Sequence, residues 1–173
     1  MELLVSVSAI AIIGTLIAQV FLTTTKVNRN SVTTQEIKQN GAFAIDTIER
    51  MVRNSRDWAY SCDIDASSTK SAAIVNPDLT VTTITCMSDG TAARIATVSA
   101  SGSVFYITGN TMTLSNSGGT SCTDSSLTFS CAPLTGTGPL SIDFVLTAKG
   151  VGINPAKPDY LRFGTSVQSR NTQ

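Results

Sequence analysis

The sequence predicts an α+β protein in which one long N-terminal helix precedes a β-rich head. Three observations lead to this prediction: an uncharged apolar run near the N-terminus, a helical stripe of apolar residues beyond it, and alternating apolar and polar residues in the remaining chain. The length of 173 residues suits one domain with an appended segment. We expect the chain to divide into residues 1–25, 26–57 and 58–173.

The apolar run extends from Leu3 to Leu22 and contains no charged residue. A helix of about 20 residues is about 30 Å long, which matches the hydrocarbon core of a bilayer. A buried core helix is the alternative, but this run is apolar on all its faces. A cleavable signal peptide would need a basic segment before the run, where an acid, Glu2, stands instead. The sequence therefore predicts a transmembrane helix within residues 1–25.

The charges around this helix are reversed for an ordinary single-pass anchor. Lys26 and Arg29 follow the run and no basic residue precedes it, so the positive-inside rule would keep the C-terminal side in the cytoplasm. The cysteines of the head indicate the opposite side, and a basic leader removed after insertion would resolve the conflict. Glu2 is a second anomaly, because a carboxylate at the edge of a membrane helix is costly unless it is paired. We expect its partner to be a cation from elsewhere, such as the terminal amine of a neighbouring subunit.

The helical pattern continues past the apolar run. Apolar or small residues recur at steps of three and four, as on one face of an amphipathic helix. This stripe consists of Ile37, Gly41, Ala44, Ile45, Ile48, Met51 and Val52. Charged residues occupy the opposite face, where Glu49 precedes Arg53 in the favourable i,i+4 orientation. We expect one helix from about Met1 to about Asn54, about 80 Å long.

The composition changes after residue 57 to Ser, Thr, Gly and short β-branched runs. Turn signals such as Asp89-Gly90 separate segments in which apolar and polar residues alternate. We expect a mostly antiparallel sheet on the helix, with the last two strands forming a hairpin near the sheet edge. The expected strands are 79–86, 94–99, 103–108, 111–115, 126–130, 140–147 and 161–169.

The four cysteines all lie beyond residue 60, and they are Cys62, Cys86, Cys122 and Cys131. An even number in a region rich in Ser, Thr and Gly indicates two disulfides and an oxidising compartment. Four cysteines allow three connectivities. We favour the pairs that are local in sequence, 62 with 86 and 122 with 131, because short loops cost least to close.

The composition argues against most catalytic and nucleic-acid-binding functions. Histidine is absent, so no His-based triad, relay or metal site can form. Charged residues make up 14% of the chain and the formal net charge is zero, which leaves no basic surface for a specific nucleic-acid site. The glycine-rich stretches are followed by no lysine of a phosphate loop. We therefore expect a non-enzymatic protein without a metal or other cofactor.

Glu2-Leu3-Leu4-Val5 and the apolar run after it resemble the N-terminal signature of type IV pilins and type II secretion pseudopilins. In that family a short basic leader ends in Gly, and the mature chain begins Phe-Thr-Leu-x-Glu before a long apolar helix. Met1 occupies the variable position just before the glutamate. The family has four residues there and this sequence has one, so the residue that forms the mature terminus stays open.

The resemblance implies a pilin-like fold, whose apolar half-helix protrudes while the amphipathic half packs on an antiparallel sheet. It implies cleavage by a prepilin peptidase, N-methylation, residence in the inner membrane, and extraction by the assembly machinery into an extracellular, homo-oligomeric helical filament. Met1, Glu2, Leu3 and Leu4 would then belong to the assembly region, with Glu2 neutralising an adjacent subunit's terminal amine. Many family members unwind near a proline that this sequence lacks, so any unwinding is expected at Gly14-Thr15, and a continuous helix is the equally open alternative.

Three functions are compatible with the sequence. The first is a major pilin, whose fibre serves adhesion, motility or DNA uptake and whose head contacts surfaces or DNA. The second is a minor pilin or pseudopilin that primes or tips the filament, because residues 43–57 and 163–171 resemble segments of some such proteins. The third is a membrane-anchored binding domain, which would not need Glu2. We expect the first, a structural subunit of an extracellular pilus filament.

Overall fold

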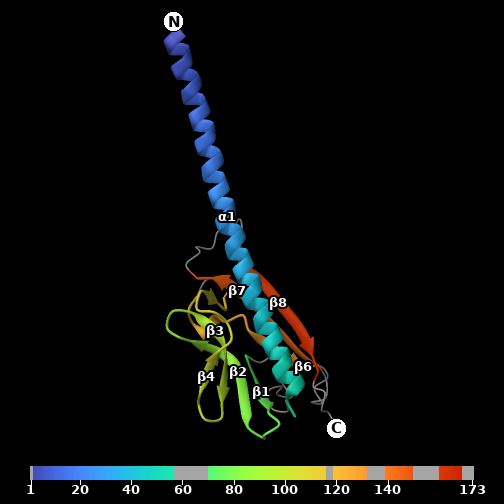
Figure 1. Cartoon of the computed structure of the whole chain (residues 1–173). Coiled ribbons are helices and arrows are strands. Elements are labelled where there is room, and N and C mark those ends of the chain that lie inside the picture. Colours follow the sequence, from blue (N-terminus) through green and yellow to red (C-terminus); the bar gives the residue numbers. More distant parts are fainter. Residues whose placement is uncertain (1, 57–69, 116–118, 132–138, 150–159, 169–173) are drawn as a thin grey trace. The chain divides into compact units, whose positions relative to one another are not determined.

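The computed structural model describes residues 2–56, 70–115, 119–131, 139–149 and 160–168 (Figure 1). Within these residues it contains one α-helix, α1 (Glu2–Asn54), followed by antiparallel strands and a single turn of 3₁₀ helix. The chain divides into two units, Met1–Glu36 and Ile37–Gln173, and α1 contributes residues to both. The expected α+β arrangement of a long helix followed by antiparallel strands is confirmed.

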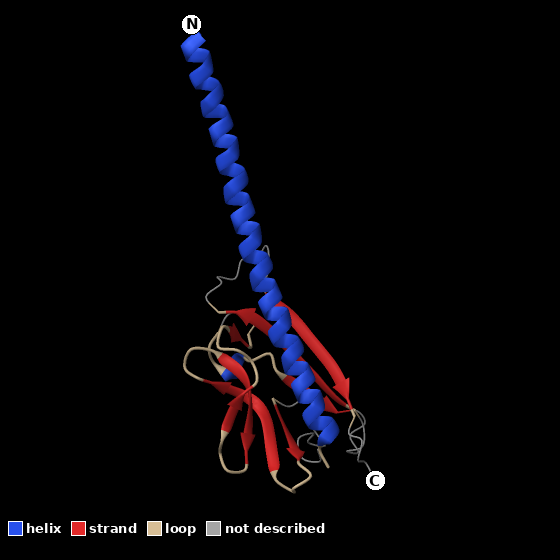
Figure 2. Ribbon diagram, in the orientation of Figure 1, coloured by secondary structure: helices blue, strands red, loops and turns tan. Residues whose placement is uncertain are grey.

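Two antiparallel sheets form the strand-rich part of the second unit (Figure 2). The first sheet has the order β1-β2-β3-β4 and consists of β1 (Ser71–Val75), β2 (Val81–Ser88), β3 (Ala93–Ser99) and β4 (Val104–Tyr106). The second sheet consists of β5 (Met112–Thr113), β6 (Thr128–Cys131), β7 (Leu140–Ala148) and β8 (Tyr160–Val167). In the second sheet β7 is central: it pairs with β8 along one side and with β5 and β6 along the other. The 3₁₀ turn η1 (Cys122–Asp124) lies between β5 and β6 in the chain.

The structure corrects the expectation of a single sheet. Beyond the pairing of Ala96 with Tyr106, two backbone N–H groups of β3 donate to side chains. Ile95 N–H donates to Thr108 Oγ1, and Ala93 N–H donates to Thr113 Oγ1. The carbonyls of Ile95 and Ala93 still accept from the backbone N–H groups of Ile107 and Leu114. The regular pairing of β3 with β4 ends at Ala96, and β5 pairs with β7. The final hairpin is confirmed as β7–β8, with β8 at the edge of the second sheet within the described residues.

The apolar stripe of α1 packs into the core as expected. Ile37, Ala44, Ile48 and Val52 are almost fully buried and belong to one core cluster with side chains of both sheets. The ion pair expected between Glu49 and Arg53 is present at 3.5 Å on the more exposed side. Both charged groups are partly exposed to solvent, so the pair contributes little to stability.

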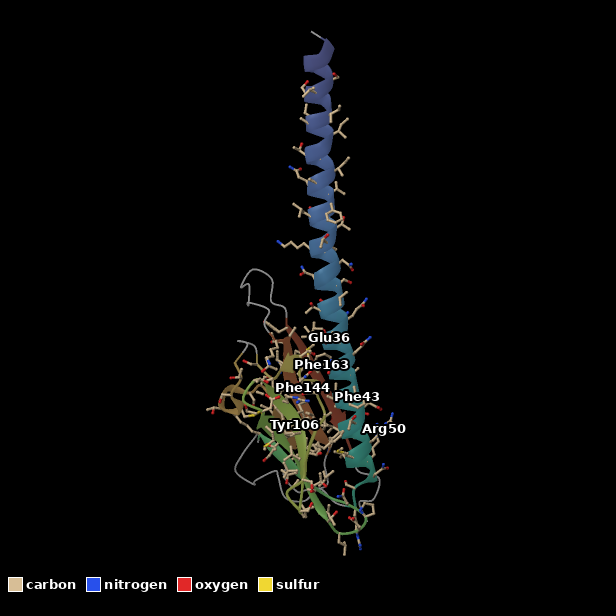
Figure 3. All side chains as sticks on the ribbon, turned by 60° about the vertical axis from the view of Figure 1, so that its left-hand side comes forward. Glu36, Phe43, Arg50, Tyr106, Phe144 and Phe163 are labelled. Atoms are coloured by element: carbon tan, nitrogen blue, oxygen red, sulfur yellow. A yellow bond between two sulfur atoms is a disulfide. The ribbon has the colours of Figure 1, made fainter. Side chains whose placement is uncertain are left out.

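The helix and the second sheet approach closely at Gly41. A Cβ atom placed on Gly41 would lie 2.1 Å from Cζ of Phe163 on β8, so only glycine leaves room for that ring. Phe163 also stacks on Phe144 of β7, with 5.4 Å between the ring centroids (Figure 3). Farther along the helix, the Thr165 hydroxyl donates to Glu49 Oε1 at 2.6 Å. The position of α1 on the second sheet therefore depends on a glycine that the sequence shows only as a small residue in the stripe.

Replacing Gly41 by alanine is expected to lower the free energy of unfolding of the head by about 1–3 kcal/mol, because the methyl group must displace the Phe163 ring. This loss opposes a gain in helix propensity of about 0.5–1 kcal/mol. Gly14→Ala is the matched control, because a Cβ there meets nothing within 4 Å and should not destabilise the head. Chemical denaturation of the two variants, followed by circular dichroism, measures the difference. Equal stabilities would contradict the close approach.

Candidate functional site

The first unit presents an unusually apolar helical surface. Every described side chain from Ser6 to Asn28 is exposed, and the large apolar side chains between Val7 and Leu22 have exposed fractions of 56–70%. Burying such a side chain stabilises by about 1.5–3 kcal/mol, so covering the whole segment is strongly favourable. By length and composition alone, the helix could cross a membrane. This surface is the first candidate functional site.

The hydroxyl groups of the threonines in this segment are compatible with an apolar environment. The hydroxyl of Thr15 donates to the carbonyl of Ile12 at 2.8 Å. Thr23, Thr24 and Thr25 donate in the same way to the carbonyl four residues earlier, at 2.8–2.9 Å. A hydroxyl that is satisfied inside its own helix leaves no unpaired group when water is removed. The Thr-rich end of the segment can therefore also be covered by lipid or by another helix.

One face of this helix is grooved. Leu16, Ile17, Val20, Phe21 and Thr24 line a shallow, almost wholly apolar depression of about 420 Å³. These positions recur at steps of one, three and four along α1, which is the spacing at which the side chains of two packed helices interdigitate. The depression is suited to an apolar side chain from another helix rather than to a polar ligand.

The predicted assembly residues lie at the start of this segment. Glu2, Leu3 and Leu4 form the first turn of α1, whereas Met1 and the side chains of these three residues lie outside the described part. The pairing expected for Glu2 therefore stays a prediction. Gly14 lies within α1, which passes through it without interruption, and a Cβ there would meet no neighbouring atom. The isolated chain shows no unwinding at that glycine.

The favoured disulfide pairing is wrong. Cys86 of β2 is bonded to Cys122 of η1, with 5.7 Å between the Cα atoms and a sequence separation of 36. Each of these cysteines was expected to pair with a nearer one. Folding brings η1 against β2. The packing of these two segments offsets the entropic cost of closing the longer loop, so the preference for cysteines that are close in sequence does not decide the pairing. Cys62 and the side chain of Cys131 lie outside the described residues.

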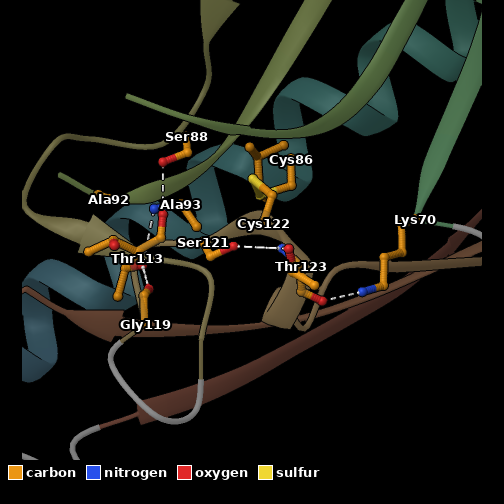
Figure 4. The surroundings of a disulfide bond; sticks show 12 residues. Lys70, Cys86, Ser88, Ala92, Ala93, Thr113, Gly119, Ser121, Cys122 and Thr123 are labelled. Carbon is orange, nitrogen blue, oxygen red and sulfur yellow. Dashed lines mark hydrogen bonds between the residues drawn. A yellow bond between two sulfur atoms is a disulfide. The ribbon is translucent and has the colours of Figure 1, made fainter. Parts of the chain in front are cut away.

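The disulfide belongs to a connected set of contacts that holds η1 on the first sheet (Figure 4). The Ser88 hydroxyl donates to the carbonyl of Thr120 at 2.8 Å, and the Thr113 hydroxyl donates to that of Gly119 at 2.7 Å. Lys70 Nζ donates to the carbonyl of Thr123 at 2.6 Å. The segment around η1 is therefore tied to the residues before β1, to β2 and to β5, and the arrangement is structural.

The described residues offer no metal centre, since none of their His, Cys, Asp and Glu side chains gather in a group of three or more. The most connected acid and base are Asp89 and Arg94, with 3.4 Å between their nearest atoms. Hydrogen bonds from Thr91, first from its hydroxyl and then from its backbone, hold the pKa of Asp89 far below its usual value. Arg94 lies 4.2 Å over the Tyr106 ring and donates to the carbonyl of Thr108. Both charges are thus engaged in stabilising the β2–β3 turn and the sheet.

Comparison of the chain with protein-family models, with curated proteins and with solved structures finds no match.

Proposed function

We propose that this chain is the structural subunit of an extracellular filament of the type IV pilus kind, which assembles through its N-terminal helix. The observation that carries the proposal is the exposed apolar surface of residues 6–25. Such a surface needs a cover in every state of the protein. Before assembly the inner membrane covers it, and in the filament the same segment of other copies does so.

Three further features support a pilin-like subunit. The second half of α1 is amphipathic and packs on an antiparallel sheet, which gives each subunit a folded head. The Cys86–Cys122 disulfide is suited to an oxidising compartment, on the far side of the membrane from the cytoplasm. No charge interrupts the helix between Leu3 and Leu22, so neighbouring copies can pack along its full length. In this proposal the protein works by self-assembly and not by catalysis.

Glu2 gives the assembled helices their register in this proposal. Its carboxylate lies at the edge of an uncharged segment, and leaving it unpaired in the filament core would be costly. The terminal amine of an adjacent copy is a cation that every subunit can supply. Pairing the two groups removes both penalties only at one axial offset, and the ion pair therefore selects a single packing of the helices.

Replacing Glu2 by alanine is expected to abolish fibres while leaving the protein in the membrane, because the apolar helix is retained but its register is not. The measurement is the amount of fibre protein sheared from cells, compared with the amount in the membrane fraction. Gln19→Ala is the control, since it removes an exposed polar group from the same helix without removing a charge. Normal fibres from the Glu2 variant would exclude amine pairing as the source of register, whereas an absence of fibres from the unsubstituted chain as well would favour a simple membrane anchor.

The same preparation distinguishes a major subunit from the alternative, a minor pilin or pseudopilin that primes or tips the filament. The resemblance of residues 43–57 and 163–171 to segments of such proteins motivates that alternative. A protein that forms most of the sheared fibre is the major subunit. Trace amounts in a fibre made of another protein would assign it the minor role.

A further inference from the structure

A groove of about 560 Å³ lies between the C-terminal part of α1 and the turn that joins β1 to β2. Its volume is within the range of about 300–1,000 Å³ that is usual for small-molecule sites. The turn contributes Asn76 and Pro77 to the lining. The helix contributes residues that recur at steps of three and four and so share one face, about 16 Å long. These are Phe43, Asp46, Thr47, Arg50, Met51 and Asn54.

Two polar side chains of the helix wall keep hydrogen-bonding groups that no described residue uses. The hydroxyl of Thr47 has no partner within the described part of the chain. In this it differs from the threonines at positions 23–25, whose hydroxyls each donate to a carbonyl of the same helix. The side-chain amide of Asn54 also bonds to no described residue. Both groups are therefore available to a ligand in the groove.

The other polar groups of the groove are held in fixed orientations. Asn76 Nδ2 donates to Thr80 Oγ1 at 3.0 Å and to Thr82 Oγ1 at 2.9 Å, which orients the amide and leaves its oxygen as an acceptor. Arg50 Nε donates to Asp46 Oδ1 at 3.1 Å, and its Nη2 lies 2.6 Å from Oδ2. This two-point pair leaves further N–H groups of the guanidinium and lone pairs of the carboxylate unused. Its charges cancel, so the lining combines fixed donors and acceptors with no net charge.

Phe43 adds an apolar platform to this polar lining. Its side chain is 55% exposed, and it lies on the same side of α1 as Arg50 (Figure 3). The face of an aromatic ring carries partial negative charge, so it attracts C–H groups, whose hydrogen atoms are slightly positive. A sugar ring presents C–H groups on one face and hydroxyl groups around its edge. The groove offers a matching surface for each.

We propose that this groove binds a short neutral saccharide, whose C–H face stacks on Phe43 and whose hydroxyl groups bond to Asp46, Thr47, Arg50 and Asn76. A hydroxyl both donates and accepts, so it can bond to each of these groups. An apolar ligand would remove the same groups from water without giving them partners, which is costly. A charged ligand would gain little, because the acid and the base of the lining already neutralise each other.

This binding goes beyond the proposed filament. The filament depends on residues of the first unit, whereas every residue that lines the groove belongs to the second unit. Saccharide binding can also be measured on single chains in micelles, where no filament is needed. Failure of either proposal therefore leaves the other standing.

The first test uses saturation-transfer NMR on the full-length chain in dodecylphosphocholine micelles, whose headgroup contains no sugar. The probes are maltose, cellobiose, lactose and diacetylchitobiose, and we expect transfer from the protein to at least one of them. Phe43→Ala should raise the dissociation constant about ten-fold or more, as on losing an aromatic anchor. Phe105→Ala is the control, because Phe105 is similarly exposed, at 62%, but lies on β4. No transfer to any probe, or equal affinities of the two variants, would overturn the proposal.

A second test examines the unused hydroxyl. Thr47→Val replaces it by a methyl group of similar size, so the unfolding midpoint should change little while the dissociation constant of the bound disaccharide rises about five-fold. Thr34→Val is the matched control, since the Thr34 hydroxyl donates to the carbonyl of Asn30 and lies outside the groove. Equal affinities of the two variants would show that the Thr47 hydroxyl does not contact the sugar.

The absence of net charge has its own test. Sialyllactose contains lactose and adds a carboxylate, so it should bind no more tightly than lactose does, and raising the salt concentration should change neither affinity. Tighter binding of sialyllactose that is lost at high salt would show that Arg50 binds anions in spite of its pairing with Asp46. That result would overturn the assignment of a neutral ligand.

Discussion

Replacing Phe144 by alanine is expected to lower the free energy of unfolding by about 3–5 kcal/mol. Phe144 lies in the middle of β7 with 1% of its surface exposed, and its ring stacks on Phe163, which in turn fills the space above Gly41. Removing the ring leaves a cavity beside Phe163, the residue that contacts the helix at Gly41. Denaturant unfolding of the purified chain, followed by the circular dichroism of its strands, measures the loss.

Phe105→Ala is the matched control for this prediction. It deletes the same ring from a side chain that is 62% exposed on β4, so the expected change is within about 0.5 kcal/mol. A loss below about 1 kcal/mol for Phe144, or a similar loss for both residues, would contradict the assignment of Phe144 to the contact between helix and sheet.

Replacing Cys86 and Cys122 together by alanine is expected to reduce the stability of the oxidised protein by about 4 kcal/mol on the chain-entropy model. The disulfide closes a segment with a sequence separation of 36, and its loss enlarges the set of unfolded conformations. It also releases η1 from β2. The measurement is again denaturant unfolding, and digestion without reduction should yield one peptide pair that links residues 86 and 122.

Ser88→Ala provides the comparison, because it removes one hydrogen bond between the same two parts of the chain, to the carbonyl of Thr120, and one within the β2–β3 turn, from the N–H of Gly90. Its expected cost is about 1–2 kcal/mol. A double cysteine variant that is no less stable than Ser88→Ala would show that the disulfide contributes little. A linked peptide joining residues 122 and 131 would show that the pairing differs from the one described.

The helix could be predicted closely because its signals are local. The absence of charge from Leu3 to Leu22 and the stripe from Ile37 to Val52 depend only on spacing along one helix. The structure has α1 ending at Asn54, as expected. The exposed apolar surface of the first unit follows from the uncharged helix of Leu3 to Leu22, so this candidate site could be predicted from the sequence.

The strands were predicted less completely. Seven expected segments correspond to strands, with ends shifted by a few residues, but β1 was missed. Its five residues include two alanines, which have weak strand propensity, and their alternating burial arises from pairing with β2. The division into two sheets was also missed, because it depends on which segments far apart in the chain pair with β3 and with β7.

The groove between α1 and the β1–β2 turn could not have been found from the sequence. The segment 79–86 has the alternation of a strand, and nothing in it marks Leu79 as a turn residue with a positive φ. The groove combines residues of α1 with Asn76 and Pro77, which are more than 20 positions away in the chain. Only packing brings these segments together.

The sequence by itself determined the long helix, its division into an apolar and an amphipathic part, and most of the strands. These properties repeat every two or every 3.6 residues and need no knowledge of distant contacts. The tertiary structure alone decided that Cys86 pairs with Cys122, that Gly41 makes room for Phe163, and that Leu79 stands at an exposed turn. Each of these depends on which segments far apart in the chain pack together. Burial of apolar surface on both segments stabilises that packing.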